Sequence, residues 1–403
     1  MIAGRTPHAL LISGPPGVGK TTLALDLAAG LLCDDPDPAA RPCRACRACR
    51  LVDRGLHLDL HRLAPSGPAD QIRIGDRDRP DPGTVRRLAA DLVLLPVEGG
   101  ARVAILERAD RLTDDAQTAL LKTLEEPPAG VTIVLCADDE ERLMPTVRSR
   151  CTRIRLGPVA TREIEAILAA MEVAEPPLAA RLARIASGRP GAARTLALAP
   201  DAVAARDEIA RTLLDLLPAG PAARLAAARD LATRAGDLAR ALDRAAAPGG
   251  GGEPVASRAR AGRGKGPAAP ASPPDGATDP APSDDATDDE AETPAASASA
   301  AERRRAAMIL IGLWRDLVRD LLVVRLGDER QVRDPGLLDD LRVAAGLLGA
   351  GGNGNGSAAS DRDAALAAFL ARLDTVGELV EGNTRPEIAL DSLLLGWPRT
   401  TPA

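Results

Sequence analysis

The chain has 403 residues, a net charge of −6 at pH 7 and 1% aromatic residues, which are one Phe and two Trp, with no Tyr. This length exceeds a single core and fits two or three domains. An acidic chain with so few aromatic rings argues against a nucleic-acid binder built on basic grooves and stacking platforms. The sequence has neither the ~20-residue apolar stretch of a membrane helix nor a signal-peptide pattern, so we expect a cytoplasmic protein.

Three apolar runs in the first part of the chain alternate with helical patterns. The runs are His8–Ser13, Val103–Glu107 and Thr132–Cys136, and a helical pattern covers Asp115–Leu124. Strands that alternate with helices predict an α/β fold with a parallel, doubly wound sheet, whose ligand binds at the carboxyl ends of the strands.

The rest of the chain has a helical pattern with one long interruption. Helical periodicity begins at Thr161, with a local break at Gly188–Gly191. After the long interruption it resumes over Glu302–Leu326, is broken by the Gly/Asn-rich Gly349–Ser357, and ends with Asp361–Leu395. The intervening stretch Ala246–Ala300 is rich in Gly, Pro, Ala, Ser and Asp, a composition that predicts a disordered linker.

A phosphate-binding loop follows the first predicted strand. Residues 14–21 read GPPGVGKT and match the G-x-x-x-x-G-K-[ST] motif between a strand and a helix. The glycines let backbone amides turn toward phosphate oxygens, Lys20 reaches the outer phosphates and Thr21 can hold Mg²⁺. The alternative is a retained loop that no longer binds or turns over nucleotide. The expected nucleotide-binding residues are Gly14, Gly17, Gly19, Lys20, Thr21 and Thr22.

Four of the six cysteines lie close together in the sequence, at Cys33, Cys43, Cys46 and Cys49. Four thiolates at this spacing predict a closed tetrahedral zinc site, which leaves no open position for chemistry and therefore has a structural role. The spacing leaves iron, a redox pair or an empty site as alternatives. His57 and His61 lie nearby, but we expect solvated or capping side chains because four cysteines already saturate the metal.

These motifs together resemble the AAA+ clamp-loader subunits of bacterial DNA polymerase III, which combine a phosphate loop with a zinc module after the first helix. The resemblance rests on His8–Ala24, Pro96–Pro128 and Glu141–Cys151 and covers most of residues 7–157. It implies an AAA+ core over 1–157 with the zinc module at 33–49, a small helical lid domain over 158–215, and an α-helical collar domain over 216–403 interrupted by the linker at about 246–300.

The resemblance also assigns a role to Ser149-Arg150-Cys151. In that family this Ser-Arg-Cys phrase carries an arginine finger that reaches the ATP site of a neighbouring subunit. Arg150, with Ser149 beside it, would thus stabilise charge on the transferring phosphoryl group in trans. The alternative for Arg150 is an ion pair at a subunit interface.

Departures from the ATPase members of the family indicate which kind of subunit this is. Active members carry Asp-Glu where this chain has Glu107 and Arg108, and a guanidinium stays protonated and cannot polarise a water molecule. Asp110 lies too far along the chain to substitute and is interpreted as a capping or solvated residue.

Two sensor positions depart as well. The polar residue expected after the third strand is replaced within Ala137-Asp138, and Gly191 stands where ATPase subunits carry an arginine. Arg189 or Arg194 can compensate for that loss.

The chain therefore resembles the delta-prime subunits, which supply an arginine finger to a neighbouring subunit but do not hydrolyse ATP. This implies gamma/tau motor subunits, delta, the sliding clamp and primed DNA as partners, with ATP and Mg²⁺ as ligands that the site can accept without hydrolysis.

One alternative is a gamma/tau-like motor that uses Glu107 for Mg²⁺, and another is a binding module in which neither nucleotide nor finger matters. No polymerase chemistry is expected of this chain, and a polymerase label would belong to the holoenzyme. Family members have a few dozen residues before the position of His8, so either the start codon is miscalled or the adenine-facing part of the pocket is absent, and we expect a miscalled start codon.

Overall fold

The computed structural model describes residues 7–67, 70–98, 100–246, 299–349, 356–382 and 384–398, and the side chains of 356–360 are not described. Apart from its ends at 246 and 299–300, the linker expected at 246–300 lies outside these residues.

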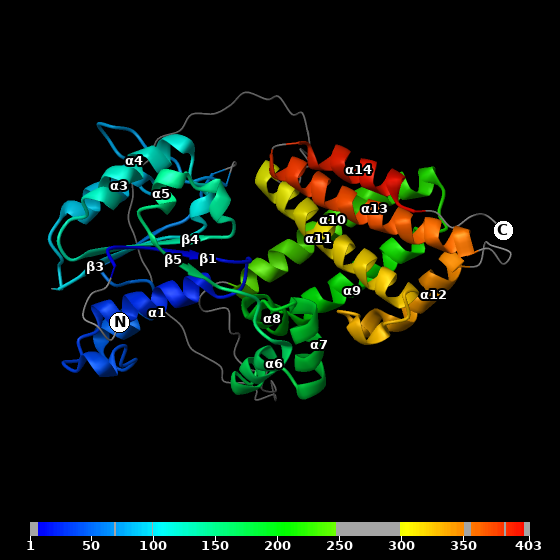
Figure 1. Ribbon diagram of the computed structural model, residues 1–403, viewed down its shortest axis with the longest axis horizontal. Helices are drawn as coiled ribbons and strands as arrows, with labels where there is room; N and C mark the ends of the chain where they lie inside the picture. The colour runs from blue at the N-terminus through cyan, green and yellow to red at the C-terminus, as the bar shows by residue number, and fades with distance from the viewer. Residues whose placement is uncertain are drawn as a thin grey trace, which may run out of the picture. The chain divides into compact units, whose positions relative to one another are not determined.

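A five-stranded parallel sheet forms the centre of the N-terminal part (Figure 1). Its strands are β1 (Ala9–Ser13), β2 (Leu60–Leu63), β3 (Arg102–Leu106), β4 (Val131–Ala137) and β5 (Thr152–Arg155). The order across the sheet is β2-β3-β4-β1-β5, and every neighbouring pair is parallel. The predicted parallel α/β sheet is therefore confirmed, with the three predicted strands at its centre.

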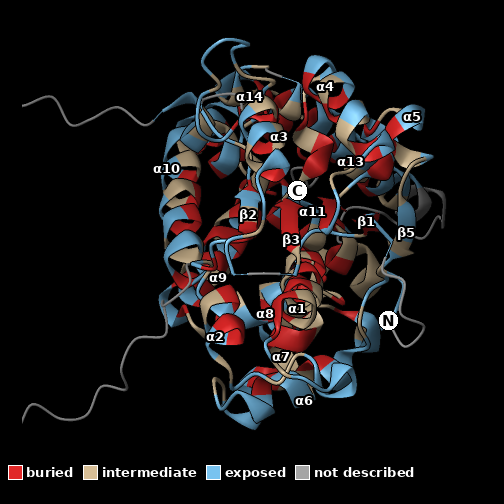
Figure 2. Ribbon diagram, turned by 90° about the vertical axis from the view of Figure 1, so that its left-hand side faces the viewer, coloured by how far each residue is buried: buried red, intermediate tan, exposed pale blue. Residues whose placement is uncertain are grey.

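Helices cover both faces of this sheet, with α1 (Lys20–Leu32) on one face and α3 (Val85–Val93) and α4 (Asp114–Glu125) on the other (Figure 1). Alternate residues of β1 enter different cores: Leu11 packs with the α3 and α4 side, and Ile12 packs with the α1 side. All five residues of β1 and of β3 are buried, and β3 appears as a buried strand in Figure 2. This double burial explains why the central strands are continuous apolar runs rather than alternating ones.

The two edge strands were not predicted from the sequence. Strand β5 reads TRIR and has no buried residue, and β2 is only four residues long. Both are held by main-chain pairing to an apolar neighbour, so their own side chains carry little periodic signal.

Apart from short 3₁₀ turns, the remaining regular elements of the described chain are α-helices. Their bounds are α2 (Arg47–Asp53), α5 (Pro145–Arg148), α6 (Thr161–Ala170), α7 (Pro176–Ala186), α8 (Pro190–Ala197), α9 (Pro200–Asp215), α10 (Pro221–Ala246), α11 (Ala300–Arg325), α12 (Leu338–Gly349), α13 (Gly356–Glu381) and α14 (Pro386–Gly396). The break predicted at Gly188–Gly191 separates α7 from α8. Among the described residues, no helix is long and apolar enough to cross a membrane.

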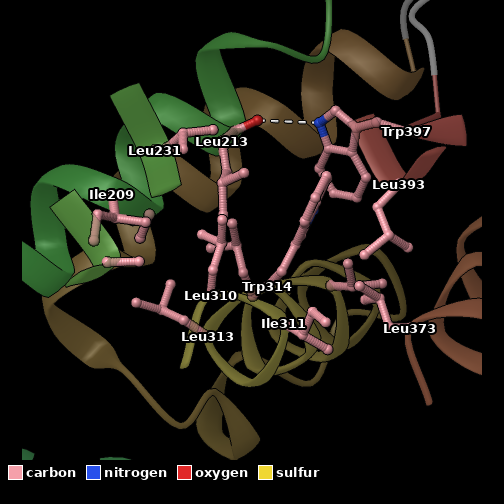
Figure 3. Packing of buried hydrophobic residues seen from close by; sticks show 14 of the residues in the cluster. Ile209, Leu213, Leu231, Leu310, Ile311, Leu313, Trp314, Leu373, Leu393 and Trp397 are labelled. Carbon is pink, nitrogen blue, oxygen red and sulfur yellow. Dashed lines mark hydrogen bonds between the residues drawn. The ribbon is translucent and has the colours of Figure 1, made fainter. Parts of the chain in front are cut away.

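The largest apolar core joins α9 to α14 and contains all the aromatic residues of the chain (Figure 3). The ring centroids of Trp314, Phe369 and Trp397 lie 4.9–5.3 Å apart in tilted or edge-to-face arrangements, which suit the quadrupoles of the rings. The indole nitrogen of Trp397 donates to the carbonyl of Leu213 at 3.0 Å. One hydrogen-bonded cluster thus ties α14 to α9 and α11.

A buried guanidinium fastens the end of α14 to the same core. Arg224 of α10 is fully buried and donates to the carbonyls of Leu216 and Leu217, which follow α9, and of Trp397 and Pro398, which follow α14. The last carbonyls of a helix carry partial negative charge and have no partner within the helix. Arg224 therefore satisfies the ends of two helices at once.

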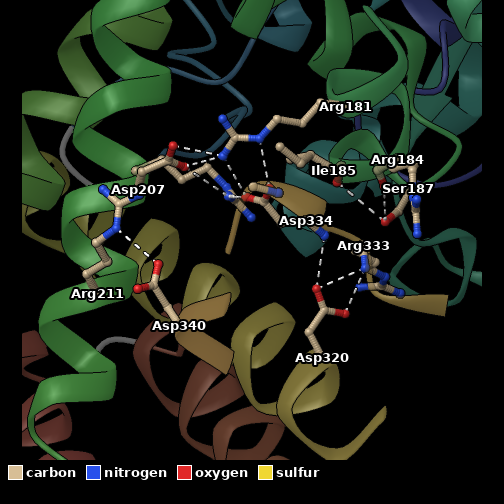
Figure 4. A network of polar contacts seen from close by, with 12 residues as sticks. Arg181, Arg184, Ile185, Ser187, Asp207, Arg211, Asp320, Arg333, Asp334 and Asp340 are labelled. Atoms are coloured by element: carbon tan, nitrogen blue, oxygen red, sulfur yellow. Dashed lines mark hydrogen bonds and ion pairs between the residues drawn. The ribbon is translucent and has the colours of Figure 1, made fainter. Parts of the chain in front are cut away.

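A second polar network links α7 with α9 and the segment before α12 (Figure 4). Asp334, 2% exposed, accepts from Arg181 of α7 at 2.8 Å and from Arg206 of α9. Burial opposes ionisation of this carboxyl, but the two guanidinium groups outweigh it and hold the pKa of Asp334 below its usual value. Asp320 of α11 fixes the same segment by accepting the amide of Asp334 at 3.0 Å.

Replacing Asp334 with Asn should lower the free energy of unfolding by about 3 kcal/mol, because Arg181 and Arg206 would lose their shared buried carboxylate. The stabilisation from Asp334 should be present above pH ~4, the usual carboxyl pKa, and fall away as the pH drops through its lower folded value. Urea unfolding followed by far-UV circular dichroism measures both effects.

The matched control is Asp340→Asn, because Asp340 pairs with Arg211 at 3.1 Å on an exposed surface. Its loss should cost below about 1 kcal/mol. Equal losses for the two variants would contradict a special role for the Asp334 network.

Candidate phosphate-binding site and cysteine cluster

The phosphate loop joins the end of β1 to the start of α1, as its motif predicts. Gly14 has φ +152°, and a Cβ there would lie 2.3 Å from the carbonyl oxygen of Leu156, the residue that follows β5. Gly17 and Gly19 have φ of +79° and +108°, which glycine adopts readily. Thr21 and Thr22 occupy the first turn of α1. The loop thus brings together all six residues predicted for nucleotide binding.

Lys20 is held by three partners inside the chain. Its Nζ contacts the carbonyl oxygens of Gly14 at 2.7 Å and Pro15 at 2.8 Å, and Oδ1 of Asp138 at 2.6 Å. A lysine ammonium has three donors. Each of them is therefore matched by an oxygen of the protein, and Lys20 is 7% exposed.

The two residues that follow β3, Glu107 and Arg108, also have partners inside the chain. Glu107 accepts from Nε of Arg62 in β2 at 2.8 Å. Arg108 adopts a left-handed conformation at φ +53° and donates to Asp70 at 2.7 Å. Oε1 of Glu107 is therefore already engaged by a guanidinium.

Asp110, expected to be a capping or a solvated residue, is buried and therefore not solvated. It is 8% exposed, and its Oδ1 accepts the backbone amide of Asp138 at 2.8 Å. Burial raises the pKa of Asp110 above its ordinary value. Because β3 and β4 are adjacent parallel strands, the residues after them meet at one edge of the sheet.

The start of α8 lies directly against the phosphate loop. The amide of Gly191 donates to the carbonyl of Gly17 at 3.0 Å, and a Cβ on Gly191 would lie only 3.0 Å from that oxygen. Arg189 turns back and donates through Nε to Ala186 at 2.8 Å. Backbone therefore occupies the place where the sequence comparison expected a sensor arginine.

Arg150 and Ser149 precede β5 and lie at the amino ends of the strands, whereas the phosphate loop lies at the carboxyl ends. Arg150 sits between α5 and β5, with Nη1 donating to Thr146 at 2.8 Å and its guanidinium paired with Glu125 at the end of α4. Ser149 is exposed and donates to the same Thr146 carbonyl at 3.1 Å. In the parallel register Leu10 is opposite Thr152, and Arg150 lies in the turn between α5 and β5, before the amino end of that strand.

The four predicted metal ligands come together after α1. The Sγ atoms of Cys33, Cys43, Cys46 and Cys49 all lie within 4.8 Å of one another, and those of Cys33 and Cys46 are 3.9 Å apart. Zn–S bonds of ~2.3 Å in a tetrahedron place sulfurs ~3.8 Å apart, so the thiols can hold such an ion.

Backbone amides support the cluster in the way thiolates require. The amides of Cys46 and Cys49 each donate to the preceding cysteine sulfur at 3.3 Å, and that of Cys43 donates to Cys33 at 3.5 Å. Burial opposes ionisation of Cys46, but amide hydrogen bonds, that from Cys49 first, outweigh it and lower its pKa to about 7. Cys33 ends α1 and Cys46 caps α2, so a bound ion would join the two helices.

Neither histidine joins the cluster. His57 is buried, accepts the amide of Asp59 through Nδ1 at 3.1 Å and lies 3.1 Å from Glu98 through Nε2. Burial lowers the pKa of His61. His57 is therefore bonded inside the protein, rather than solvated as one of the two expected states had it.

Three contacts of the site were not predicted. Arg62 as the partner of Glu107, Asp70 as the partner of Arg108 and Asp138 as the partner of Lys20 belong to no motif. Asp138 was expected only as part of a replaced sensor position. A carboxyl directly after the third predicted strand, at the same end of the sheet as the phosphate loop, was the available signal.

Replacing Cys46 with Ser should remove close to one equivalent of bound metal per chain, because a three-thiol site of this size loses its closed tetrahedron. Inductively coupled plasma mass spectrometry of the purified protein measures both the amount and the element. Cys151→Ser is the control, since Cys151 lies outside the cluster and should retain the metal. Equal metal contents in the two variants would contradict the four-cysteine site.

Comparison with known proteins agrees with this geometry. Residues 1–160 match the family model described as DNA polymerase III, delta subunit. The delta′ subunit of DNA polymerase III from Escherichia coli is 36% identical over 219 residues, which are 54% of this chain and 62% of that protein. The tau subunit from the same organism is 34% identical over 190 residues, covering 46% of this chain and 28% of that protein.

The chain thus spans less than two thirds of the length of these relatives. Among solved structures, a gamma subunit-related protein of DNA polymerase III from Thermotoga maritima aligns over 98% of this chain and 96% of its own, with 15% identity and a TM-score of 0.39. That alignment is too loose to carry an argument. The family match and the similarity to named delta′ proteins confirm, for the N-terminal part of the chain, the resemblance to the delta-prime subunits of DNA polymerase III.

Proposed function

We propose that the chain is a delta-prime-like subunit of a DNA polymerase III clamp loader, which helps to load the sliding clamp on primed DNA. Its own phosphate loop does not hydrolyse ATP, and Arg150 completes the ATP site of a neighbouring gamma/tau subunit. The similarity to delta′ and tau proteins supports this function, and the position of Arg150 carries the proposed mechanism.

The parallel register supports an action of Arg150 in trans. Thr152 at the start of β5 is opposite Leu10, whereas the phosphate loop begins four residues further along β1 at Gly14. At ~3.3 Å per residue, the start of β5, which Arg150 precedes, lies about 13 Å from the loop along the strand direction. An arginine at that edge is out of reach of its own loop and is available to another subunit.

The surroundings of the phosphate loop support the absence of hydrolysis. Phosphoryl transfer needs a carboxylate on Mg²⁺ and a group that orients the attacking water. Glu107 is paired with Arg62, and the next residue is a guanidinium bound to Asp70. The residues fit a nucleotide cradle through Gly14, Gly19 and Lys20, but lack a free carboxylate where catalysis requires one.

The remaining parts of the proposal concern architecture. Residues 1–157 form an AAA+ core, 158–215 a lid, and the helices of 216–403 a collar that contacts gamma/tau and delta. The four cysteines hold zinc in a structural role, because thiolates in a closed tetrahedron suit that ion and leave no position for substrate. The apolar cluster of α6 to α8, to which α9 adds Val203, supports a lid, whereas the other buried apolar residues of α9 belong to the large core of α9 to α14.

Replacing Arg150 with Ala should leave assembly intact and lower the DNA-stimulated ATPase rate at the site that it completes by about 10³-fold or more, since a finger neutralises charge only in the transition state. The measurement is steady-state ATP turnover of the reconstituted complex with gamma/tau, delta, clamp and primed DNA. Arg153→Ala is the matched control, because Arg153 is an exposed arginine three residues away.

An unchanged rate of ATP turnover in a complex containing the Arg150→Ala variant would contradict the role of Arg150 as an arginine finger. Steady hydrolysis by the isolated chain, abolished by Lys20→Ala, would instead identify a motor-type subunit. Clamp loading by a chain that lacks residues 1–157 would favour a binding module that acts through the helical part alone.

A further inference from the structure

The partner of Lys20 has a consequence for the ligand of the phosphate loop. In such loops the lysine reaches the β- and γ-phosphates of a nucleotide. Here the Asp138 carboxylate lies 2.6 Å from Nζ, and the other two partners are the uncharged carbonyls of Gly14 and Pro15. Asp138 therefore supplies the negative charge that an outer phosphate would bring.

Asp138 is held in this position by neighbouring structure. It follows β4, which pairs with β1 on one side and β3 on the other, so it stands at the same sheet edge as the loop. Its amide is fixed by Asp110 at 2.8 Å, and its side chain is 26% exposed. A carboxylate anchored through its backbone retains this position more readily than one on a loose segment.

The described contacts between the start of α8 and the loop come from the backbone and not from a guanidinium group. The start of α8 offers the backbone of Gly191 to the loop, at 3.0 Å from Gly17, rather than a side chain. Arg189 donates through Nε to Ala186 within its own helix turn. A γ-phosphate placed beside Lys20 would thus meet the Asp138 carboxylate at close range, where like charges repel strongly.

We propose that Asp138 makes the phosphate loop selective for a nucleoside diphosphate over a nucleoside triphosphate, with its carboxylate taking the place of the outermost phosphate on Lys20. This inference rests on the phosphate loop being a nucleotide site, as in the proposed function, and does not depend on Arg150. A diphosphate would share Lys20 with Asp138, whereas a triphosphate would have to displace it.

The test is equilibrium binding of the fluorescent nucleotides mant-ADP and mant-ATPγS to the isolated full chain in the presence of Mg²⁺. Wild type should bind the diphosphate about tenfold or more tightly than the triphosphate. Asp138→Asn should bring this ratio close to one, mainly through tighter binding of the triphosphate. Lys20→Ala should lose binding of the diphosphate.

The matched control is Asp139→Asn, which removes the same charge one residue away from an exposed carboxylate that caps a short helix. It should keep the wild-type ratio. A wild-type preference for the triphosphate, a ratio that Asp138→Asn leaves unchanged, or binding of neither nucleotide by wild type would each overturn the proposal. ATP turnover of the complex with Arg150→Ala reports separately on the proposed function, so the two can fail independently.

Discussion

The parallel pairing of β1 with β4 and β5 is the constraint on which the arrangement of functional groups depends. Parallel strands bring all their carboxyl ends to one edge of a sheet and all their amino ends to the other. The phosphate loop, Glu107 and Asp138 accordingly share one edge, and Arg150 belongs to the other. Under the proposed function, one chain would bind nucleotide at one end of the sheet and offer Arg150 to a neighbouring subunit at the other.

The charged residues at the carboxyl ends of the strands, around the phosphate loop, neutralise one another. Lys20 faces Asp138, Glu107 faces Arg62 and Arg108 faces Asp70. In an active nucleotide site these charges would be balanced by phosphate and Mg²⁺. An edge whose charges are already balanced inside the protein needs no ligand to neutralise it.

The sequence predicted the centre of the sheet well and its edges poorly. Strands buried on both faces leave continuous apolar runs such as that of β4, and the phosphate loop and cysteine spacing are local motifs. Strand β5 and the short α2 depend on contacts with distant segments, so their own residues show little pattern. The phosphate-loop residues and the four cysteines were predictable because they belong to local motifs. Arg62, Asp70 and Asp138, by contrast, become partners only when separate strands meet.

The helical part is stabilised differently from the sheet, because buried ionic and aromatic groups supplement a core built largely from Ala and Leu. Arg224 fastens the end of α14 and Asp334 joins α7 to α9, while Trp314, Phe369 and Trp397 gather at one place. Since the chain contains no Tyr and no other aromatic ring, its near-ultraviolet absorption and intrinsic fluorescence arise from this one cluster. The protein thus carries a native optical reporter of packing in its helical part, and because the described sheet region is silent at the same wavelengths, this signal is free of interference from the sheet.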